Sequence, residues 1–179
     1  ANNLGTGKYA VNLIRAYEVL GNEVCLIPPF GSVSIPDGDV SRWLSNRERF
    51  NRADPSMMIF DIPFLFNFSG IPKIGMAVFE TDGFNPLQIA ALKSCDFLLV
   101  PSEWGKRVLA MHGLHAEVVP EGFDPFIFQC GRREPYRKPV FVHVGKYEER
   151  KGTEQAVRCF ARALEGGEAV LILHAHNPF

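Results

Sequence analysis

The segment V-G-K-Y-E-E-R-K-G-T at 144–153 holds more residues capable of binding a charged ligand than any other part of the chain. The apolar run 140–144 predicts a strand that ends at Gly145, and a helical pattern begins near Thr153. Lys146 and Lys151 lie in the intervening loop and can converge on an anion at the helix N-terminus, where backbone N–H groups lack partners. Two lysines beside such N–H groups suit a diphosphate. A solvated run of charges is the simpler interpretation.

A second candidate is F-E-T-D-G at 79–83, which directly follows the apolar run 74–79. Ligands of open α/β sheets bind at the carboxyl ends of the strands. Acidic side chains there can hold sugar hydroxyls through charge-assisted hydrogen bonds, which makes Glu80 a candidate catalytic residue. A polar turn between a strand and a helix is the alternative.

A third candidate is G-T-G at 5–7, a glycine-rich turn expected to enter a helix, with Lys8 adding charge. Glycines let the backbone approach an anion. The segment is not a P-loop, because Tyr9 stands where Ser or Thr would bind magnesium. A dinucleotide fingerprint tolerates Ala10 at its third glycine position, but Glu23 is poorly placed as its acidic residue. An ordinary tight turn stays open as an interpretation.

The elements that position these segments alternate between strands and helices. Short apolar runs predict strands at 24–27, 57–60, 74–79, 97–100, 118–119, 140–144 and 169–173. Helices are expected from the G-T-G turn to Gly21, and after three capping residues, Asn85, Ser102 and Thr153. This alternation favours an α/β fold with parallel strands.

The stretch at 126–139 differs in composition from the residues before it, because it is basic and contains prolines, and it is expected to be a linker. It divides a Rossmann-like first domain, residues 1–125, from residues 140–179, the first β-α-β unit of a second Rossmann-like domain. The chain starts at Ala1 without a strand before the first helix, and it stops just after an apolar strand. We therefore expect a piece of a longer protein.

Composition excludes several classes of protein. The 19 Lys and Arg nearly balance the 20 Asp and Glu, so binding of nucleic acid through bulk charge is excluded, and 46% hydrophobic residues exclude a disordered chain. No apolar run approaches the roughly 20 residues of a membrane span. The four cysteines form no CxxC pair and the histidines form no zinc pattern, which predicts reduced, mostly buried thiols and no metal. A membrane-surface patch is an alternative for one basic and aromatic cluster, made of Arg42, Trp43, Arg47, Arg49, Phe50 and Arg52.

Taken in order, five motifs resemble those of retaining glycosyltransferases of the GT-B fold, of the family-4 type. They are G-T-G at 5–7, F-E-T-D at 79–82, V-P-S-E-W at 100–104, V-P-E-G-F-D at 119–124 and V-G-K-Y-E-E-R-K-G at 144–152. The resemblance covers nearly the whole chain. It implies two Rossmann-like domains facing each other across a cleft, the first holding the acceptor and the second binding the nucleotide-sugar donor.

The resemblance also implies roles for single residues. The residues that it implies contact the donor diphosphate are Gly7, Gly145, Lys146 and Lys151. Glu80 stands near the reacting sugar, where many members have a histidine and a subgroup has glutamate. Glu121 and Gly122 form the loop leading to the interdomain linker. The family's paired glutamates, which bind the sugar and the ribose, are not in this sequence.

The implied reaction is displacement of a nucleoside diphosphate by an acceptor hydroxyl, with retention at the anomeric carbon. The expected partners are a nucleotide sugar and a carbohydrate or lipid-linked acceptor. No metal is expected, because positive side chains and helix dipoles stabilise the negative charge of the departing diphosphate instead. We expect a cytoplasmic protein, with attachment to the inner face of the membrane as an alternative. A non-catalytic nucleotide- or sugar-binding module and a dinucleotide-dependent oxidoreductase stay open as other functions.

The chain alone is expected to have little or no transferase activity. Its 140–179 unit is small and apolar, so we expect it to pack on the first domain, to pair with another copy of the chain, or to be poorly ordered.

Overall fold

The computed structural model describes residues 5–28, 33, 38–125, 128–129, 131, 137–164 and 166–175. The chain divides into two compact units, Ala1–Phe128 and Gln129–Phe179. Most of the stretch expected to link two domains, together with Cys130 and His176, lies outside the described residues.

A four-stranded parallel sheet forms the centre of the first unit. Its strands run in the order β1-β2-β3-β4, and each neighbouring pair is parallel. The strands are β1 (Ser56–Phe60), β2 (Lys73–Ala77), β3 (Phe97–Val100) and β4 (Glu117–Val118). The predicted parallel α/β sheet is therefore present, and it is compatible with a Rossmann-like fold.

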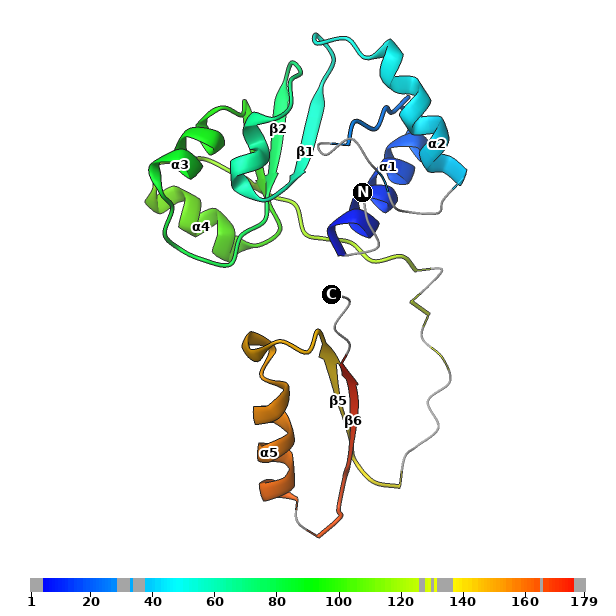
Figure 1. The fold of residues 1–179 in the computed structure, drawn as a ribbon, viewed down its shortest axis with the longest axis vertical. Coiled ribbons are helices and arrows are strands. Elements are labelled where there is room, and N and C mark those ends of the chain that lie inside the picture. Colours follow the sequence, from blue (N-terminus) through cyan, green and yellow to red (C-terminus); the bar gives the residue numbers. More distant parts are fainter. Residues whose placement is uncertain are drawn as a thin grey trace. The chain divides into compact units, whose positions relative to one another are not determined.

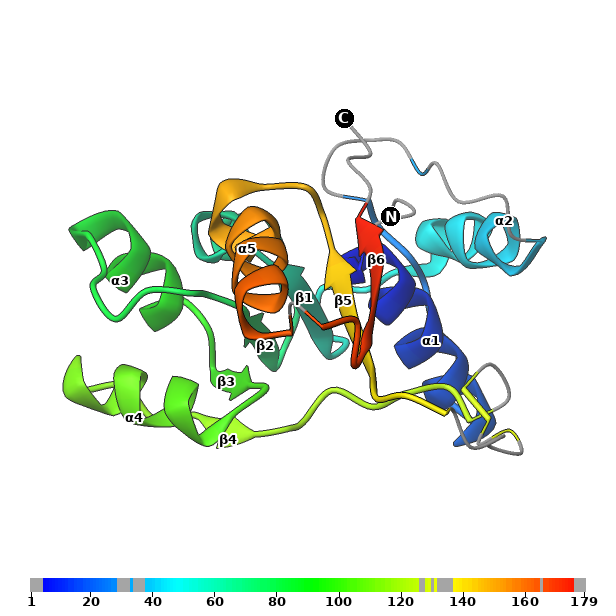
Figure 2. The same ribbon diagram turned by 90° about the horizontal axis from the view of Figure 1, so that it is seen from below.

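Helices flank this sheet on two sides. They are α1 (Gly5–Val19), α2 (Gly38–Ser45), α3 (Pro86–Lys93) and α4 (Glu103–Met111), with short 3₁₀ turns η1 (Asn46–Arg49) and η2 (Ile62–Phe66). Figures 1 and 2 both place α1 and α2 on one side of the strands, and α3 and α4 on the other.

Side-chain caps fix where α3 and α4 begin, as the sequence predicts. The Asn85 side chain accepts a hydrogen bond from the backbone N–H of Gln88 (2.9 Å), and the Gln88 side chain accepts one from the N–H of Asn85 (2.9 Å). Ser102 Oγ accepts from the N–H of Gly105 (3.1 Å). Each cap satisfies N–H groups that the first helical turn leaves open, and so sets the length of the loop after β2 or β3.

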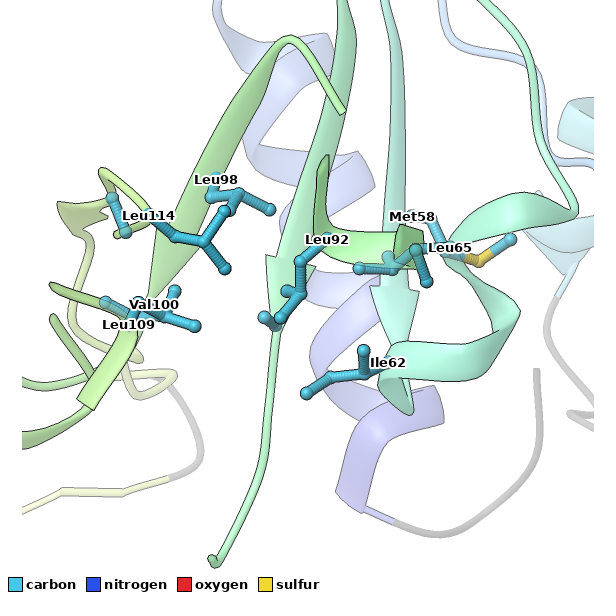
Figure 3. Packing of buried hydrophobic residues seen from close by; sticks show 11 residues of the cluster. Met58, Ile62, Leu65, Leu92, Leu98, Val100, Leu109 and Leu114 are labelled. Carbon is cyan, nitrogen blue, oxygen red and sulfur yellow. The ribbon is translucent and has the colours of Figure 1, made fainter. Parts of the chain in front are cut away.

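The main core lies between the sheet and the helices α3 and α4, with η2 completing the layer (Figure 3). Leu65, Leu92 and Leu109 have no exposed surface, and one comes from each of these elements. Gly75 on β2 permits the close packing here, because a Cβ at this position would lie 2.8 Å from Cys95 Sγ. Met58, Ile62, Leu98, Val100 and Leu114 complete the labelled set.

A smaller core joins α1 to α2 through Val11, Val40 and Trp43. Ion pairs cover it: Arg42 contacts Glu18 at 2.5 Å and Asp39 at 3.2 Å. Arg15 contacts Asp39 at 3.3 Å as well. The two carboxylates therefore tie the start of α2 to the second half of α1.

The prediction of a strand at 24–27 is wrong. The N–H of Leu26 donates to the carbonyl of Trp43 (3.0 Å), and Asn46 Nδ2 donates to the carbonyl of Val24 (3.0 Å). This extended segment bonds to α2 and to the residue after it, not to a neighbouring strand. A four-residue apolar run has no periodicity that distinguishes these two environments.

The membrane-surface interpretation of the arginine cluster also fails in part. Trp43 is 0% exposed, so its ring is a core side chain and not a membrane anchor. Arg42 is paired with carboxylates, and Arg49 is paired with Glu23. Within the described residues, no helix combines the length and the apolar character needed to cross a bilayer.

The second unit is a β-α-β arrangement (Figure 1). Strands β5 (Val140–Gly145) and β6 (Val170–Ala175) pair in parallel, and α5 (Thr153–Ala163) follows the turn η3 (Glu149–Lys151). Phe141 on β5 packs edge-on against Phe160 on α5, with ring centroids 5.6 Å apart. The predicted order of elements is confirmed here, and β6 ends two residues later than expected.

Thr153 is not the cap of α5, contrary to the sequence prediction. Gly152 is the N-cap, with a left-handed φ of 66°, and Thr153 is the first helical residue. Thr153 is 6% exposed, and its hydroxyl lies 3.0 Å from His143 Nε2. Its hydrogen bond therefore joins the helix to β5 instead of closing the helix end.

The cysteines agree only in part with the expected buried thiols. Cys25, Cys95 and Cys159 are free; the first two are half-buried and Cys159 is exposed. Burial raises the pKa of both the Cys25 and the Cys95 thiol.

Candidate functional site

The carboxyl edge of the first sheet gathers the segments that follow its strands. The register pairs Phe60 with Ala77 and Val100 with Val118, and parallel strands end at the same edge. Glu80 lies three residues beyond the end of β2 and is exposed. The structure thus places Glu80 at the end of the sheet where ligands of such folds bind.

Aromatic rings hold both ends of the Glu80 loop, which we define as residues 80–83. Phe79, before the loop, packs edge-on against Phe84, after it, with centroids 5.0 Å apart. Trp104 on α4 lies 5.6 Å from the Phe79 ring. The loop is therefore closed at its base by an apolar contact and joined to the first turn of α4.

His112 holds the same loop at its far side. Its Nε2 lies 2.8 Å from the carbonyl oxygen of Asp82, and its ring lies 4.9 Å from that of Phe84. A carbonyl oxygen only accepts, so Nε2 carries the hydrogen and donates it. Sequence reasoning missed His112, because thirty residues separate it from Asp82 and no short motif joins them.

The G-T-G segment is helical and not the expected turn. Helix α1 begins at Gly5, so 5–7 is its first turn, and Gly7 is buried. Burial raises the pKa of Tyr9, and the charge of Glu121 raises it further. Glu121 and Gly122 themselves are exposed.

In the second unit the turn after β5 brings Gly145 and Lys151 together. A Cβ on Gly145 would lie 3.8 Å from Lys151 Cγ, so the lysine stem crosses the end of the strand. Lys146 Nζ lies 3.7 Å from Glu148 Oε1, and Arg150 Nε lies 2.9 Å from Glu148 Oε2. One carboxylate thus faces two cations, a pairing that the sequence did not indicate.

Backbone hydrogen bonds hold this loop in shape. The N–H of Glu148 donates to the carbonyl of Lys146 (2.9 Å), and the N–H of Lys151 donates to the carbonyl of Glu148 (3.0 Å). Gly152 then turns the chain into α5, whose N-cap has no side-chain hydrogen bond. The first turn of α5 keeps its N–H groups directed out of the helix toward this loop.

An open hollow of about 370 Å³ lies beside the start of α5, lined by Tyr147, Glu148, Glu149, Thr153, Glu154 and Gln155. Three of these side chains are carboxylates, and neither Lys146 nor Lys151 lines it. The lining of the hollow is therefore acidic, and Lys146 and Lys151 are not part of it. No set of three His, Cys, Asp or Glu side chains placed to hold a metal ion occurs in the part of the chain that the structure describes.

The candidate residues fall into two groups, one in each unit. Gly7, Glu80, Glu121 and Gly122 belong to the first unit, and Gly145, Lys146 and Lys151 to the second. Comparison with protein-family models, with curated proteins and with solved structures finds no match for this chain.

Proposed function

We propose that this chain is part of a retaining glycosyltransferase of GT-B architecture, in which the second unit binds the diphosphate of a nucleotide-sugar donor. The observation that carries the proposal is the turn after β5, where the Lys151 stem lies against Gly145 immediately before α5. A cation and a helix N-terminus at the end of a parallel strand suit a diphosphate.

The first unit supports the same function. Glu80 follows β2 at the carboxyl edge, and its loop is held by Phe79, Phe84 and His112. A carboxylate fixed there is suited to bind a sugar hydroxyl or to stabilise positive charge at the anomeric carbon. We assign Glu80 the role of catalytic residue on this basis.

In the proposed reaction an acceptor hydroxyl attacks the anomeric carbon from the face that the diphosphate leaves. The bond between the anomeric carbon and the diphosphate oxygen breaks, and the hydroxyl proton passes to the departing diphosphate. Lys146, Lys151 and the α5 N-terminus stabilise the negative charge of that group. We propose no metal ion for this step.

Binding of nucleoside diphosphates to the full chain tests the proposal. UDP, GDP and ADP and their sugar conjugates are titrated by calorimetry, with a nicotinamide dinucleotide as the comparison ligand. Charge-assisted contacts contribute about 1.5–3 kcal/mol each, so Lys151→Ala is expected to weaken binding about tenfold or more. Lys146→Arg keeps the charge and is expected to bind nearly as well as the parent chain.

Arg162→Ala is the matched control. Arg162 lies in the last turn of α5, so its substitution removes one positive charge from the same unit at the opposite end of the helix. Equal affinities of the Lys151→Ala and Arg162→Ala variants would remove the assignment. Preferential binding of the nicotinamide dinucleotide would favour an oxidoreductase, and tight donor binding without sugar transfer in any longer form would favour a non-catalytic module.

A further inference from the structure

Glu148 occupies the centre of the cationic loop between β5 and α5. The loop from Lys146 to Lys151 holds three cations and two carboxylates, and Glu148 contacts two of the cations. Its carboxylate presents one oxygen to Lys146 and the other to Arg150. This bidentate arrangement is the one that an oxyanion of a bound phosphate group would adopt with the same two side chains.

We propose that Glu148 takes the place of the ligand's anionic group in the unliganded loop, and that a diphosphate displaces it and gains Arg150 as an additional cation. The inference rests on the proposed function for the identity of the loop as a diphosphate site. It adds two residues to that site: Arg150 as a binding residue and Glu148 as an internal competitor.

The backbone of the loop allows this exchange. The N–H and the carbonyl of Glu148 are both engaged, with Lys146 and Lys151 respectively, so the main chain stays in place when the side chain rotates. The Glu148 side chain is 28% exposed and the Arg150 side chain 51% exposed, so both side chains reach solvent. Displacement therefore costs the two ion pairs and no refolding of the loop.

The exchange favours ligands of high charge. A diphosphate carries two or more negative charges and replaces a carboxylate that carries one, so the cations gain charge opposite them. An anion with a single charge gains nothing by displacing Glu148. The loop is therefore expected to discriminate in favour of diphosphates over singly charged phosphate esters.

The test is a titration of the full chain with inorganic pyrophosphate at low ionic strength, where ion pairs are least screened. Glu148→Gln removes the competing charge while keeping the shape of the side chain. Ion pairs that are partly exposed contribute modestly, so we expect pyrophosphate to bind about three- to tenfold more tightly. Glu149→Gln is the matched control, because it makes the same change of net charge one residue away, and its gain is expected to stay below about twofold.

Two more variants separate local from general effects. Glu148→Gln combined with Arg150→Gln is expected to lose the gain, because the cation that the first substitution releases is removed by the second. Glu148→Asp keeps the charge but is too short to reach both cations, so an intermediate gain is expected. This variant decides the matter if circular dichroism shows that Glu148→Gln does not fold.

Equal gains for Glu148→Gln and Glu149→Gln would overturn the inference, and so would the absence of pyrophosphate binding in every variant. Titration of the same variants with UDP, GDP and ADP separates this inference from the proposed function. Nucleoside diphosphate binding that depends on Lys151 but is unchanged in Glu148→Gln refutes only the inference. A pyrophosphate gain in Glu148→Gln without any binding of nucleotides refutes only the proposed function.

Discussion

Replacing His112 with alanine is expected to loosen the Glu80 loop and to destabilise the first unit. The substitution removes the hydrogen bond from Nε2 to the Asp82 carbonyl, which contributes about 0.5–1.5 kcal/mol. It also removes the ring contact with Phe84, which contributes about 0.5–1.5 kcal/mol. Together these contacts predict a loss of about 1–3 kcal/mol in the free energy of unfolding.

Urea denaturation followed by tryptophan fluorescence measures this loss in the right part of the chain. Both tryptophans, Trp43 and Trp104, belong to the first unit, so the signal reports its unfolding and not that of the second. Trp104 also lies against Phe79 at the base of the loop. Its emission therefore responds to a change in the loop itself.

Two further variants make the measurement decisive. His115→Ala is the matched control, because His115 is exposed and lies three residues further along the same connection. His112→Gln can present an amide N–H near the position of Nε2. We therefore expect it to recover the part of the unfolding free energy that the hydrogen bond contributes. If His112→Ala and His115→Ala unfold at the same urea concentration, the histidine does not hold the loop and the reasoning is refuted. If His112→Gln recovers nothing, the hydrogen bond is not the cause.

Two other predictions concern acid stability and turnover. Hydrogen bonds from Arg42 lower the pKa of Glu18 and of Asp39 from their ordinary values of 4.5 and 3.8. The unfolded chain therefore binds more protons than the folded one, so the stabilisation by these ion pairs is complete above the ordinary pKa values and is lost as the pH falls below them. Urea denaturation at a series of pH values measures this loss of unfolding free energy. We expect the Arg42→Gln variant to lose less of its unfolding free energy on acidification than the parent chain. In a longer, complete form of the enzyme, Glu80→Gln is expected to lower the turnover of sugar transfer by more than about tenfold, or roughly 1.4 kcal/mol, with unchanged affinity for the nucleoside diphosphate. Unchanged turnover would reduce Glu80 to a turn residue.

The features that the sequence predicts well are those decided within a few residues. Asn85 and Ser102 begin helices because each side chain bonds a backbone N–H three residues further on, and no distant part of the chain is needed. The strands 57–60 and 97–100 are likewise confirmed, because each is a short apolar run preceded by a polar residue and followed by Asp61 or Pro101. These local signals were enough to establish the parallel sheet and the edge at which Glu80 lies.

The features that the sequence predicts poorly depend on partners far along the chain. Val24 to Ile27 has the composition of a buried strand, yet Asn46 and the carbonyl of Trp43 bond its backbone. Thr153 has the composition of a cap, yet its hydroxyl is engaged by His143 on the preceding strand. In each case the short-range pattern is compatible with two environments, and a tertiary hydrogen bond decides between them.

The loop between β5 and α5 shows the same division within a single segment of sequence. Spacing alone predicts that Lys146 and Lys151 can converge, and the structure places the Lys151 stem beside Gly145 at the end of β5. Spacing does not reveal that Glu148 lies between Lys146 and Arg150, because a carboxylate in a charged run is usually solvated. If the loop binds a diphosphate as proposed, its affinity depends on this balance, since each cation held by Glu148 is released before it can contact the ligand. A motif can therefore locate the binding residues, while the charge that opposes binding is found only from their contacts.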